Sequence, residues 1–471
     1  MTAGIKFRVR EVDVFSSPHI NMRFPFQFGA AVISGCASVY LRVTLESDQG
    51  KHAAGVSSCG LSSFWFDKEG ALESGEDPGL LLRTVRVASE AYLSAGSGSA
   101  WELHQQVNPA VRKTLGDEGL NDLTAGYGIA LMDAAIVDAI CRMAGTTFHQ
   151  ALRGNLLGLD PELTRILPET PARSIHLRHT VGLMDPIRCS DLQDPLHDGL
   201  PEALEEIIRE YGVSYFKIKV SRDIDSMRER LIRIAEILES EVRDYYVTFD
   251  GNEDFQEMQA FQEFIRQIHS EPRLSRFWER ILFIEQPLAR NLALEDSVSD
   301  SLHAIKELKP VIIDESDGTD DALDQALQLG YSGTSVKYCK GVLKTLNNYF
   351  KRAQWEKDGR GEIILSAEDL THVPVVGLHQ DLCTAAALGL KHCERNGQHY
   401  YRGLDVLDPA EWDGVLSNYP SLYRKRSQDL VTLEVRQGRL SLDEINLHGF
   451  GVIKEPDWNL LEQVGLPGRK D

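Results

Sequence analysis

The stretch Tyr215-Phe-Lys-Ile-Lys-Val-Ser-Arg-Asp-Ile-Asp-Ser-Met-Arg-Glu-Arg-Leu231 sets the pattern for the second half of this sequence. A short apolar run is followed by apolar residues three or four apart, which is typical of a strand leading into a helix with one buried face. The strand-like runs recur at 245–249, 281–284, 311–313, 334–336, 363–365 and 400–401. This alternation predicts an α/β fold with a parallel sheet. Seven to eight repeats over roughly 230 residues favour a closed (β/α)8 TIM barrel over an open doubly wound sheet, and no GxGxxG motif follows a strand.

The sequence before the barrel indicates an α+β unit. Ser38 to Glu46 alternates apolar and polar residues like a half-buried antiparallel strand. Leu80 to Ser94 and Tyr127 to Ala144 have the composition and spacing of packed helices. We therefore assign residues 1–150 to an N-terminal α+β domain and residues 151–410 to the barrel.

Residues 411–471 return to strand-like sequence. Leu430 to Val435 and Arg439 to Leu442 flank Gln437-Gly438, a plausible hairpin turn. Because neither strand could bury a face alone, we expect this segment to pack back onto the N-terminal domain.

Composition excludes several functional classes. The 50 Lys and Arg residues against 71 Asp and Glu give a net charge of −21, which is unfavourable for binding nucleic acid. No stretch approaches the roughly 20 apolar residues of a membrane span, and the charged start lacks the apolar core of a signal peptide. Seven cysteines without a CxxC pair argue against disulfides and cysteine-ligated zinc, so we expect a cytoplasmic protein.

Three carboxylates end successive predicted strands: Asp250, Glu285 and Asp314. One such residue alone is more often a helix cap or a solvated turn. The carboxyl ends of neighbouring barrel strands converge on one face, however, so the three groups should meet and would repel each other unless compensated. A Mg²⁺ ion, which prefers oxygen ligands, resolves that conflict. Residues next to the ligands in the sequence could hydrogen-bond and orient them, namely Asn252, Gln286 and Glu315.

Lysines occupy two other strands of the predicted barrel. Lys217 and Lys219 are two apart and point to the same side of their strand, and the apolar residues between them need a covering helix, so the lysines should face the interior. Lys337 follows the sixth strand-like run and should lie across the barrel from Lys219. We expect burial and a neighbouring cation, supplied by Lys217, to lower the pKa of such a lysine until it can act as a base.

The joint pattern is similar to the enolase superfamily, and within it to the muconate lactonizing enzyme subgroup and its mandelate racemase relatives. The resemblance covers most of the chain and rests on five motifs in the family's order: Lys217-Ile-Lys219, Asp250-Gly-Asn252, Glu285-Gln-Pro287, Asp314-Glu-Ser316 and Ser335-Val-Lys337. It implies an α+β capping domain over a modified barrel. It also implies Mg²⁺ held by Asp250, Glu285 and Asp314, and a lysine that removes a proton alpha to a carboxylate.

The chain departs from the family pattern in places that concern the substrate. It carries apparent insertions at Cys189 to Gly199 and between Asp250 and Glu285. Lys337 stands where the mandelate racemase subgroup keeps an Asp-His pair. The segment Gln398 to Gly403, taken as the eighth strand, lacks the Asp-x-Asp with which dipeptide epimerases hold an ammonium group.

Weaker candidates follow the seventh strand and precede the barrel. Glu368 and His372 could contact substrate or act as acid and base, although caps and loop residues are the commoner outcome. Phe26, Phe28 and the cluster 64–66 could face substrate or belong to the core.

The expected function is a Mg²⁺-dependent racemase, epimerase or cycloisomerase acting on a small carboxylate, and we expect a homo-oligomer. An acid-sugar dehydratase-type lyase is an alternative. A Schiff-base aldolase using Lys337 as nucleophile would have no use for three carboxylates. A non-catalytic binding or structural protein on the same fold is a further alternative, although such a protein usually has no reason to keep all three carboxylates and both lysines.

Overall fold

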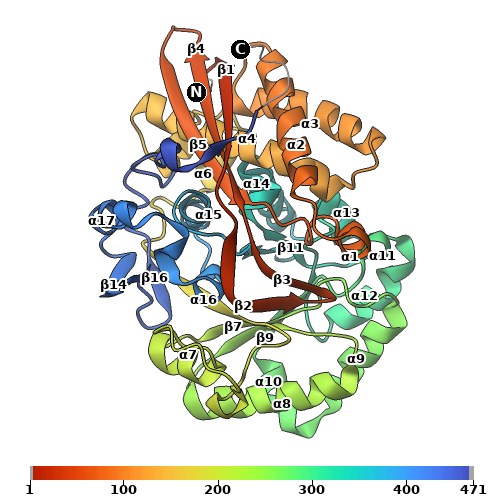
Figure 1. The fold of residues 1–471 in the computed structure, drawn as a ribbon. Helices are drawn as coiled ribbons and strands as arrows, with labels where there is room; N and C mark the ends of the chain where they lie inside the picture. The colour runs from red at the N-terminus through yellow and green to blue at the C-terminus, as the bar shows by residue number, and fades with distance from the viewer. Residues whose placement is uncertain (1–3, 466–471) are drawn as a thin grey trace.

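The computed structural model describes residues 4–465, which form an antiparallel N-terminal unit set over a parallel barrel (Figure 1). The expected α/β class and the TIM barrel with an α+β unit over it are confirmed. Whether residues 1–150, 151–410 and 411–471 are separate domains stays a prediction.

Eight parallel strands make the barrel, and each lies beside the strand next to it in the chain. They are β6 (Ser174–Val181), β7 (Tyr215–Lys219), β8 (Tyr246–Asp250), β9 (Ile281–Glu285), β10 (Val311–Ile312), β11 (Gly333–Val336), β12 (Ile364–Ala367) and β13 (His392–Glu394). A parallel bridge between Ile313 and Thr334 joins β10 to β11 and closes the ring. Because β7 and β11 are four positions apart in the ring in either direction, residues at their ends face each other.

Helices connect the strands and cover the outside of the barrel (Figure 1). The longer ones are α7 (Leu204–Tyr211), α8 (Ile224–Glu241), α9 (Met258–Ser270), α12 (Ser299–Lys306), α13 (Ala322–Leu329), α14 (Val342–Lys357) and α15 (Val376–Ala387). Shorter ones are α10 (Ser275–Glu279), α11 (Arg290–Ala293) and α16 (Gly397–Tyr400), and the ten-residue α17 (Pro409–Asn418) follows the last barrel strand. In α8 the predicted apolar positions Met227, Leu231 and Leu238 are buried, as the spacing requires.

The expected eighth strand at Tyr400-Tyr401 is wrong. The last barrel strand is β13, and Tyr400 ends helix α16. The sequence of β13 contains one apolar residue, Cys393, so it has neither the alternation nor the apolar run that marks a strand. Only pairing with β6 and β12 on either side makes it one.

The N-terminal unit is a sheet in the order β17-β1-β4-β5, backed by helices. Its strands are β1 (Phe7–Ser16), β4 (Ser38–Ser47), β5 (His52–Gly60) and β17 (Glu462–Gln463). Its helices are α1 (Lys68–Ser74), α2 (Pro78–Ser94), α3 (Ala100–Asp117) and α4 (Asp122–Ala144), followed by α5 (Phe148–Arg153) and α6 (Leu163–Ile166).

Helix α4 corrects one expectation about membranes. Within residues 4–465 it is long and apolar enough to span a bilayer, although no stretch of that kind was expected. All of its apolar window is buried inside the protein, between the sheet and helices α2 and α3. A helix packed in the core of a protein can be as long and as apolar as a membrane span, and α4 is such a helix.

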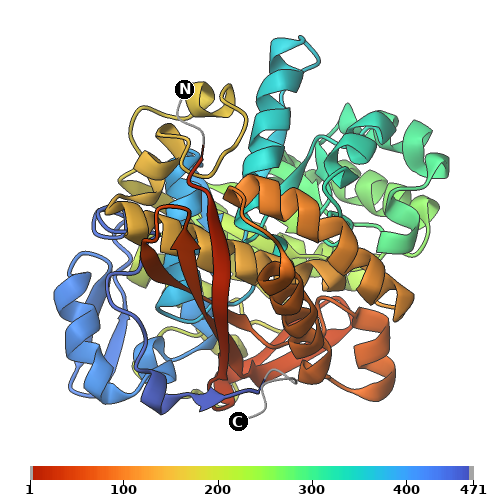
Figure 2. The same ribbon diagram turned by 90° about the horizontal axis from the view of Figure 1, so that it is seen from above.

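The C-terminal segment divides between the two units, and the expected hairpin is reduced to one antiparallel bridge, between Arg436 and Arg439. β15 (Leu430–Leu433) pairs with β14 (Tyr423–Ser427), whereas β16 (Arg439–Ser441) pairs with β6 of the barrel. Only the end of the segment reaches the N-terminal sheet, where β17 pairs with β1. Figure 2 shows this blue segment running to the end of the red strands. Gln437-Gly438 does form a tight turn, but its flanks enter different sheets.

A buried polar cluster ties the helices of the N-terminal unit together. Asp133 on α4 accepts a hydrogen bond from Tyr92 on α2 (2.5 Å) and lies 2.7 Å from His104 Nδ1 on α3. Burial acts to lower the pKa of His104, but the Asp133 and Asp320 carboxylates together outweigh it and raise the pKa to about 10. The imidazole is therefore charged in the folded protein at neutral pH.

We predict that His104→Gln lowers the free energy of unfolding by roughly 3–5 kcal/mol at pH 6, because a buried carboxylate loses its cation. A raised pKa stabilises the fold fully below about 6.5, and that stabilisation is lost as pH rises toward the folded value. The difference between wild type and variant should therefore shrink by pH 9.5 in urea denaturation. The control is the exposed His52→Gln, and a gap that is constant with pH would contradict the charged pair.

Candidate active site

The carboxyl ends of the barrel strands bring the predicted residues together. Lys219, Asp250 and Glu285 are consecutive cross-strand partners on β7, β8 and β9. Glu285 pairs with Ile312, the last residue of β10, which places Asp314 two residues beyond the end of that strand. All four of these charged side chains are buried, and their close approach requires that their charges compensate each other.

Lys217 lies at the centre of one charge cluster. Its Nζ is 2.9 Å from Asp250 Oδ2, 2.9 Å from Glu285 Oε1, 2.6 Å from Glu368 and 3.0 Å from Glu394. Burial acts to lower the pKa of Lys217, but these four carboxylates raise it well above its usual value. Lys217 is therefore a fixed cation beneath the strand ends.

Asp314 organises a second cluster on the opposite side. Lys337 donates to its Oδ2 and Ser335 to its Oδ1, and Lys340 Nζ lies 2.9 Å from Oδ1. Gln286 Oε1 accepts a hydrogen bond from the backbone N–H of Asp314 at 2.7 Å, so the expected supporting role of Gln286 has a direct contact.

The expectation that Lys337 has a lowered pKa is wrong for the side chains as they lie. Burial and Lys217 do act in that direction, but the contacting Asp314 carboxylate, together with Glu285 and Glu394, outweighs both and raises the pKa. The same ion pair keeps the pKa of Asp314 well below its usual value despite burial.

Asn252 and Glu315 also lie beside the strand ends. Asn252 Nδ2 donates to Glu315 Oε1 at 3.0 Å, while Asn252 Oδ1 and Glu315 Oε2 are buried without a hydrogen-bond partner in the described chain. Burial and the nearby Asp314 carboxylate raise the pKa of Glu315.

A small cavity separates the two lysines that face each other. Lys219 and Lys337 both line it, together with Asn252 and Glu394, and its volume is about 40 Å³. That volume accommodates a few water molecules, so an organic acid needs the surrounding segments to shift.

Aromatic side chains from the N-terminal unit cover this cavity. The hairpin of β2 (Ile20–Phe28) and β3 (Ala31–Cys36) brings the ring centroids of Phe26 and Phe28 to 5.7 and 5.9 Å from Lys219 Nζ. The ring centroid of Trp65 lies 4.5 Å from Lys337 Nζ. These rings line the cavity, whereas Phe66 is fully buried in the core. Of the aromatic candidates, Phe26, Phe28 and Trp65 thus face the cavity, and Phe66 belongs to the core.

Glu368 and His372 do not reach the cavity. Glu368 lies between Arg178 and Lys217, and burial together with Glu394 raises its pKa to about 7 against the lowering effect of those two cations. His372 contacts Cys59 Sγ at 3.5 Å and Tyr338. Both side chains support the walls of the site rather than its opening.

Glu394, at the end of β13, was missed from the sequence. It lines the cavity, accepts a hydrogen bond from Thr180 at 2.6 Å and contacts Lys217. A strand-ending acid was the signal used for the other carboxylates. It failed here because β13 itself was not recognised.

The donor set suits Mg²⁺, although the side chains as they lie do not enclose an ion. Asp250, Glu285 and Asp314 offer hard carboxylate oxygens, and the unpartnered Asn252 and Glu315 oxygens add to the excess of acceptors at this edge. Among residues 4–465, however, no three acidic, His or Cys side chains are grouped closely enough to hold a metal. Lys217 Nζ lies between Asp250 and Glu285, and lysines also contact Asp314. An ion would replace those ammonium contacts.

Comparison with solved structures places the fold among known enzymes. Dipeptide epimerase from Enterococcus faecalis V583, complexed with Mg and L-Leu-L-Tyr, is 16% identical with a TM-score of 0.59, covering 94% of this chain and 99% of that one. 2-Chloromuconate cycloisomerase from Rhodococcus opacus 1CP is 15% identical with a TM-score of 0.62, covering 96% and 98%. An enolase from Bradyrhizobium, complexed with magnesium and mandelic acid, is 14% identical with a TM-score of 0.60, covering 99% and 100%.

These likenesses confirm the resemblance to mandelate racemase and muconate lactonizing proteins at the level of the fold. No family model and no curated protein sequence matches the chain.

We predict that Lys217→Met lowers the free energy of unfolding by roughly 3–5 kcal/mol in the absence of added Mg²⁺, because several buried carboxylates lose their shared cation. Urea denaturation measures the change. Lys357→Met at the exposed end of α14 is the control and should change stability by less than about 0.5 kcal/mol. A loss for Lys217→Met as small as that of the control would contradict the central role of this ammonium group.

Proposed function

We propose that this protein is a Mg²⁺-dependent enzyme that removes a proton alpha to the carboxylate of a small organic acid, as a racemase, epimerase or cycloisomerase. One arrangement carries the proposal. Lys219 and Lys337 line the same cavity from opposite sides of the barrel, beside Asp250, Glu285 and Asp314.

Each lysine has a distinct role at its Nζ atom. A substrate with its alpha carbon between the two ammonium groups presents one face to Lys219 and the other to Lys337. The neutral amine on one face accepts the proton, and the ammonium on the other face returns one. In a cycloisomerisation only one lysine transfers the proton, and the other stays a cation.

A Mg²⁺ ion held by Asp250, Glu285 and Asp314 would neutralise the negative charge that develops on the substrate carboxylate. The carboxylates that raise the pKa of Lys337 would then be compensated by the ion, which favours the neutral amine of this lysine.

The roof of the cavity orients the substrate and excludes water. Phe26 and Phe28 lie over Lys219, and Trp65 lies over Lys337. The indole Nε1–H of Trp65 is buried and has no partner in the described chain, so it is free to donate to a substrate oxygen. Exclusion of water strengthens every charge interaction inside the cavity.

Three alternatives predict different products or none. An acid-sugar dehydratase-type lyase would release water from its substrate. A Schiff-base aldolase would be trapped covalently on Lys337 by borohydride. A non-catalytic protein would exchange no alpha proton at all.

We predict that Lys219→Ala and Lys337→Ala lose alpha-proton exchange on opposite enantiomers of a turned-over acid. Each variant keeps one base, so one enantiomer still exchanges with D₂O while the other slows about 10²–10⁴-fold. Proton NMR of a racemic acid library in D₂O measures both rates. The exposed Lys357→Ala is the control and should exchange both enantiomers as wild type does. Unchanged exchange of both enantiomers by both lysine variants would end the proposal.

We further predict that Mg²⁺ binds the protein and raises its melting temperature, and that Asp314→Asn weakens this effect at least tenfold in Mg²⁺ concentration because a charged ligand is lost. Differential scanning fluorimetry with and without EDTA measures it. The matched control is Asp413→Asn on the exposed face of α17. Equal Mg²⁺ dependence in both variants would place the ion elsewhere.

A further inference from the structure

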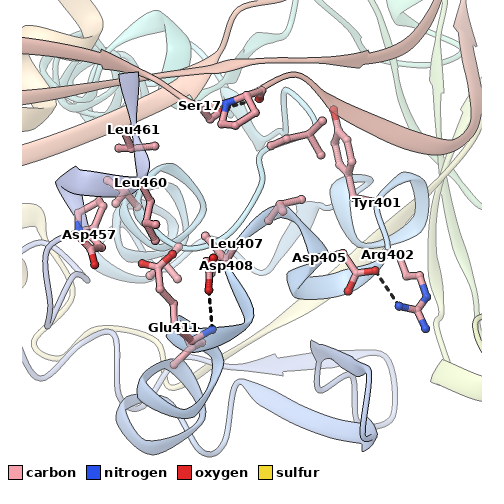
Figure 3. A pocket seen from close by; sticks show the side chains of 18 of the residues that line it. Ser17, Tyr401, Arg402, Asp405, Leu407, Asp408, Glu411, Asp457, Leu460 and Leu461 are labelled. Carbon is pink, nitrogen blue, oxygen red and sulfur yellow. Dashed lines mark hydrogen bonds and ion pairs between the residues drawn. The ribbon is translucent and has the colours of Figure 1, made fainter. Parts of the chain in front are cut away.

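A second, larger pocket lies on the side of the N-terminal unit, outside the barrel mouth. Its volume is about 790 Å³, against about 40 Å³ for the cavity between the lysines. Figure 3 shows Leu460, Leu461 and Asp457 of the C-terminal segment on one wall and Tyr401, Arg402 and Asp405 on the opposite wall, with Ser17 above and Glu411 below. The pocket has the size of a small-molecule site.

The pocket presents apolar surface that the protein itself does not bury. Leu196 and Leu460 are 40% and 44% exposed, which makes them two of the few large exposed apolar side chains, and both line the pocket. Leu407 and Leu461, both half-buried, continue this surface. An organic ligand would bury these side chains at a gain of about 25 cal/mol per Å².

The charge of the pocket is negative after its internal ion pairs are counted. Arg23 pairs with Asp198 at 2.6 Å and Arg402 pairs with Asp405 at 2.7 Å. In the described chain no ion pair involves Asp408, Glu411 or Asp457, whereas Glu455, the other lining carboxylate, pairs with Arg42 at 3.3 Å. The exposed Lys454 is the one other Lys or Arg in the lining. Burial and the Asp457 and Asp408 carboxylates raise the pKa of Glu411, against the lowering effect of hydrogen bonds from the backbone of the same two residues. No cation of the described chain forms an ion pair with Glu411.

An unpartnered hydroxyl group points to a ligand independently of the charge. Tyr40 on β4 lines the pocket and is 5% exposed, and none of the described residues forms a hydrogen bond with its hydroxyl. Burial and the charge of Glu411 raise the pKa of Tyr40. The hydroxyl is therefore open to a molecule in the pocket, with which it can form a hydrogen bond.

The pocket adjoins the cavity of the proposed active site. Met22 and Tyr401 are the two residues that line both spaces. The Tyr401 hydroxyl group rests 3.9 Å from Cys36 Sγ on the cavity side. The part of the pocket at Met22 and Tyr401 is therefore one side chain away from the cavity between Lys219 and Lys337.

We propose that this pocket binds an organic cation, a primary amine on an aliphatic or aromatic body, with its ammonium group at Glu411 and the Tyr40 hydroxyl and its apolar part on Leu460 and Leu461. The amine is either a separate ligand or the far end of a long substrate. Only the second source rests on the function proposed above.

Isothermal titration with hexylammonium and with the uncharged 1-hexanol tests the site on the full-length protein. We expect hexylammonium to bind about tenfold more tightly or better, since the charge interaction adds to the same apolar contact. Equal affinity for the two probes would overturn the proposal.

Three variants locate the site. Glu411→Gln should remove most of the advantage of hexylammonium, and Tyr40→Phe should weaken its binding about threefold. Asp413→Asn, which removes an exposed carboxylate of the same helix α17, should stay within about twofold of wild type. If Asp413→Asn weakens binding as much as Glu411→Gln does, only the overall negative charge attracts the amine, and the proposal fails.

Binding of 8-aminooctanoate separates the two sources of the amine. If the amine is the far end of a substrate, both Glu411→Gln and Lys337→Ala weaken binding of this ω-amino acid. If it is a separate ligand, only Glu411→Gln does. Because the hexylammonium titration involves no turnover, failure of the pocket and failure of the proposed catalytic function give different results.

Discussion

Compensation of buried charge at the carboxyl ends of the barrel strands is the constraint on which the rest of this structure depends. Asp250, Glu285, Glu368 and Glu394 surround one ammonium group, that of Lys217, and Asp314 holds two more. Removing one partner from such a cluster leaves an uncompensated charge in a medium that solvates it poorly. The closed ring of strands keeps these groups at fixed distances, so the barrel and its charge cluster require each other.

The N-terminal unit completes the site from above. Hairpin β2–β3 and the segment with Trp65 place aromatic rings on both facing lysines. Polar contacts hold this roof to the barrel: Arg290 bonds to Glu253 and to the backbone carbonyls of Trp65 and Phe66, and Lys68 bonds to Glu253. Sequence inspection gave no sign of the contacts that cross from the barrel to the roof, because their partners are more than 180 residues apart and none belongs to a motif. The chemistry of the barrel and the shape of its cavity are thus set by different parts of the chain.

The limits of prediction follow from how much local pattern each element carries. Strands β7 to β9 are apolar runs that end in Lys or acid, and their positions were predicted within about a residue. Strand β13 carries no such pattern, and its misassignment hid Glu394. The tail was misread for a related reason: Arg439 to Ser441 has strand composition, but its partner is the first barrel strand rather than the nearest strand in the chain.

The sequence by itself determined the fold class and the residues that meet at the strand ends, because strand periodicity and parallel connection leave one edge on which strand-ending side chains converge. Only the tertiary structure decided how their charges are distributed. The motif Lys217-Ile-Lys219 places two ammonium groups on one face, yet one lies inside a cage of four carboxylates and the other faces the cavity. The protonation of Lys337 also depends on the tertiary structure, because contact with Asp314 raises its pKa. Electrostatic energy depends on distances of a few ångströms between side chains from different strands, and those distances exist only once the barrel has closed.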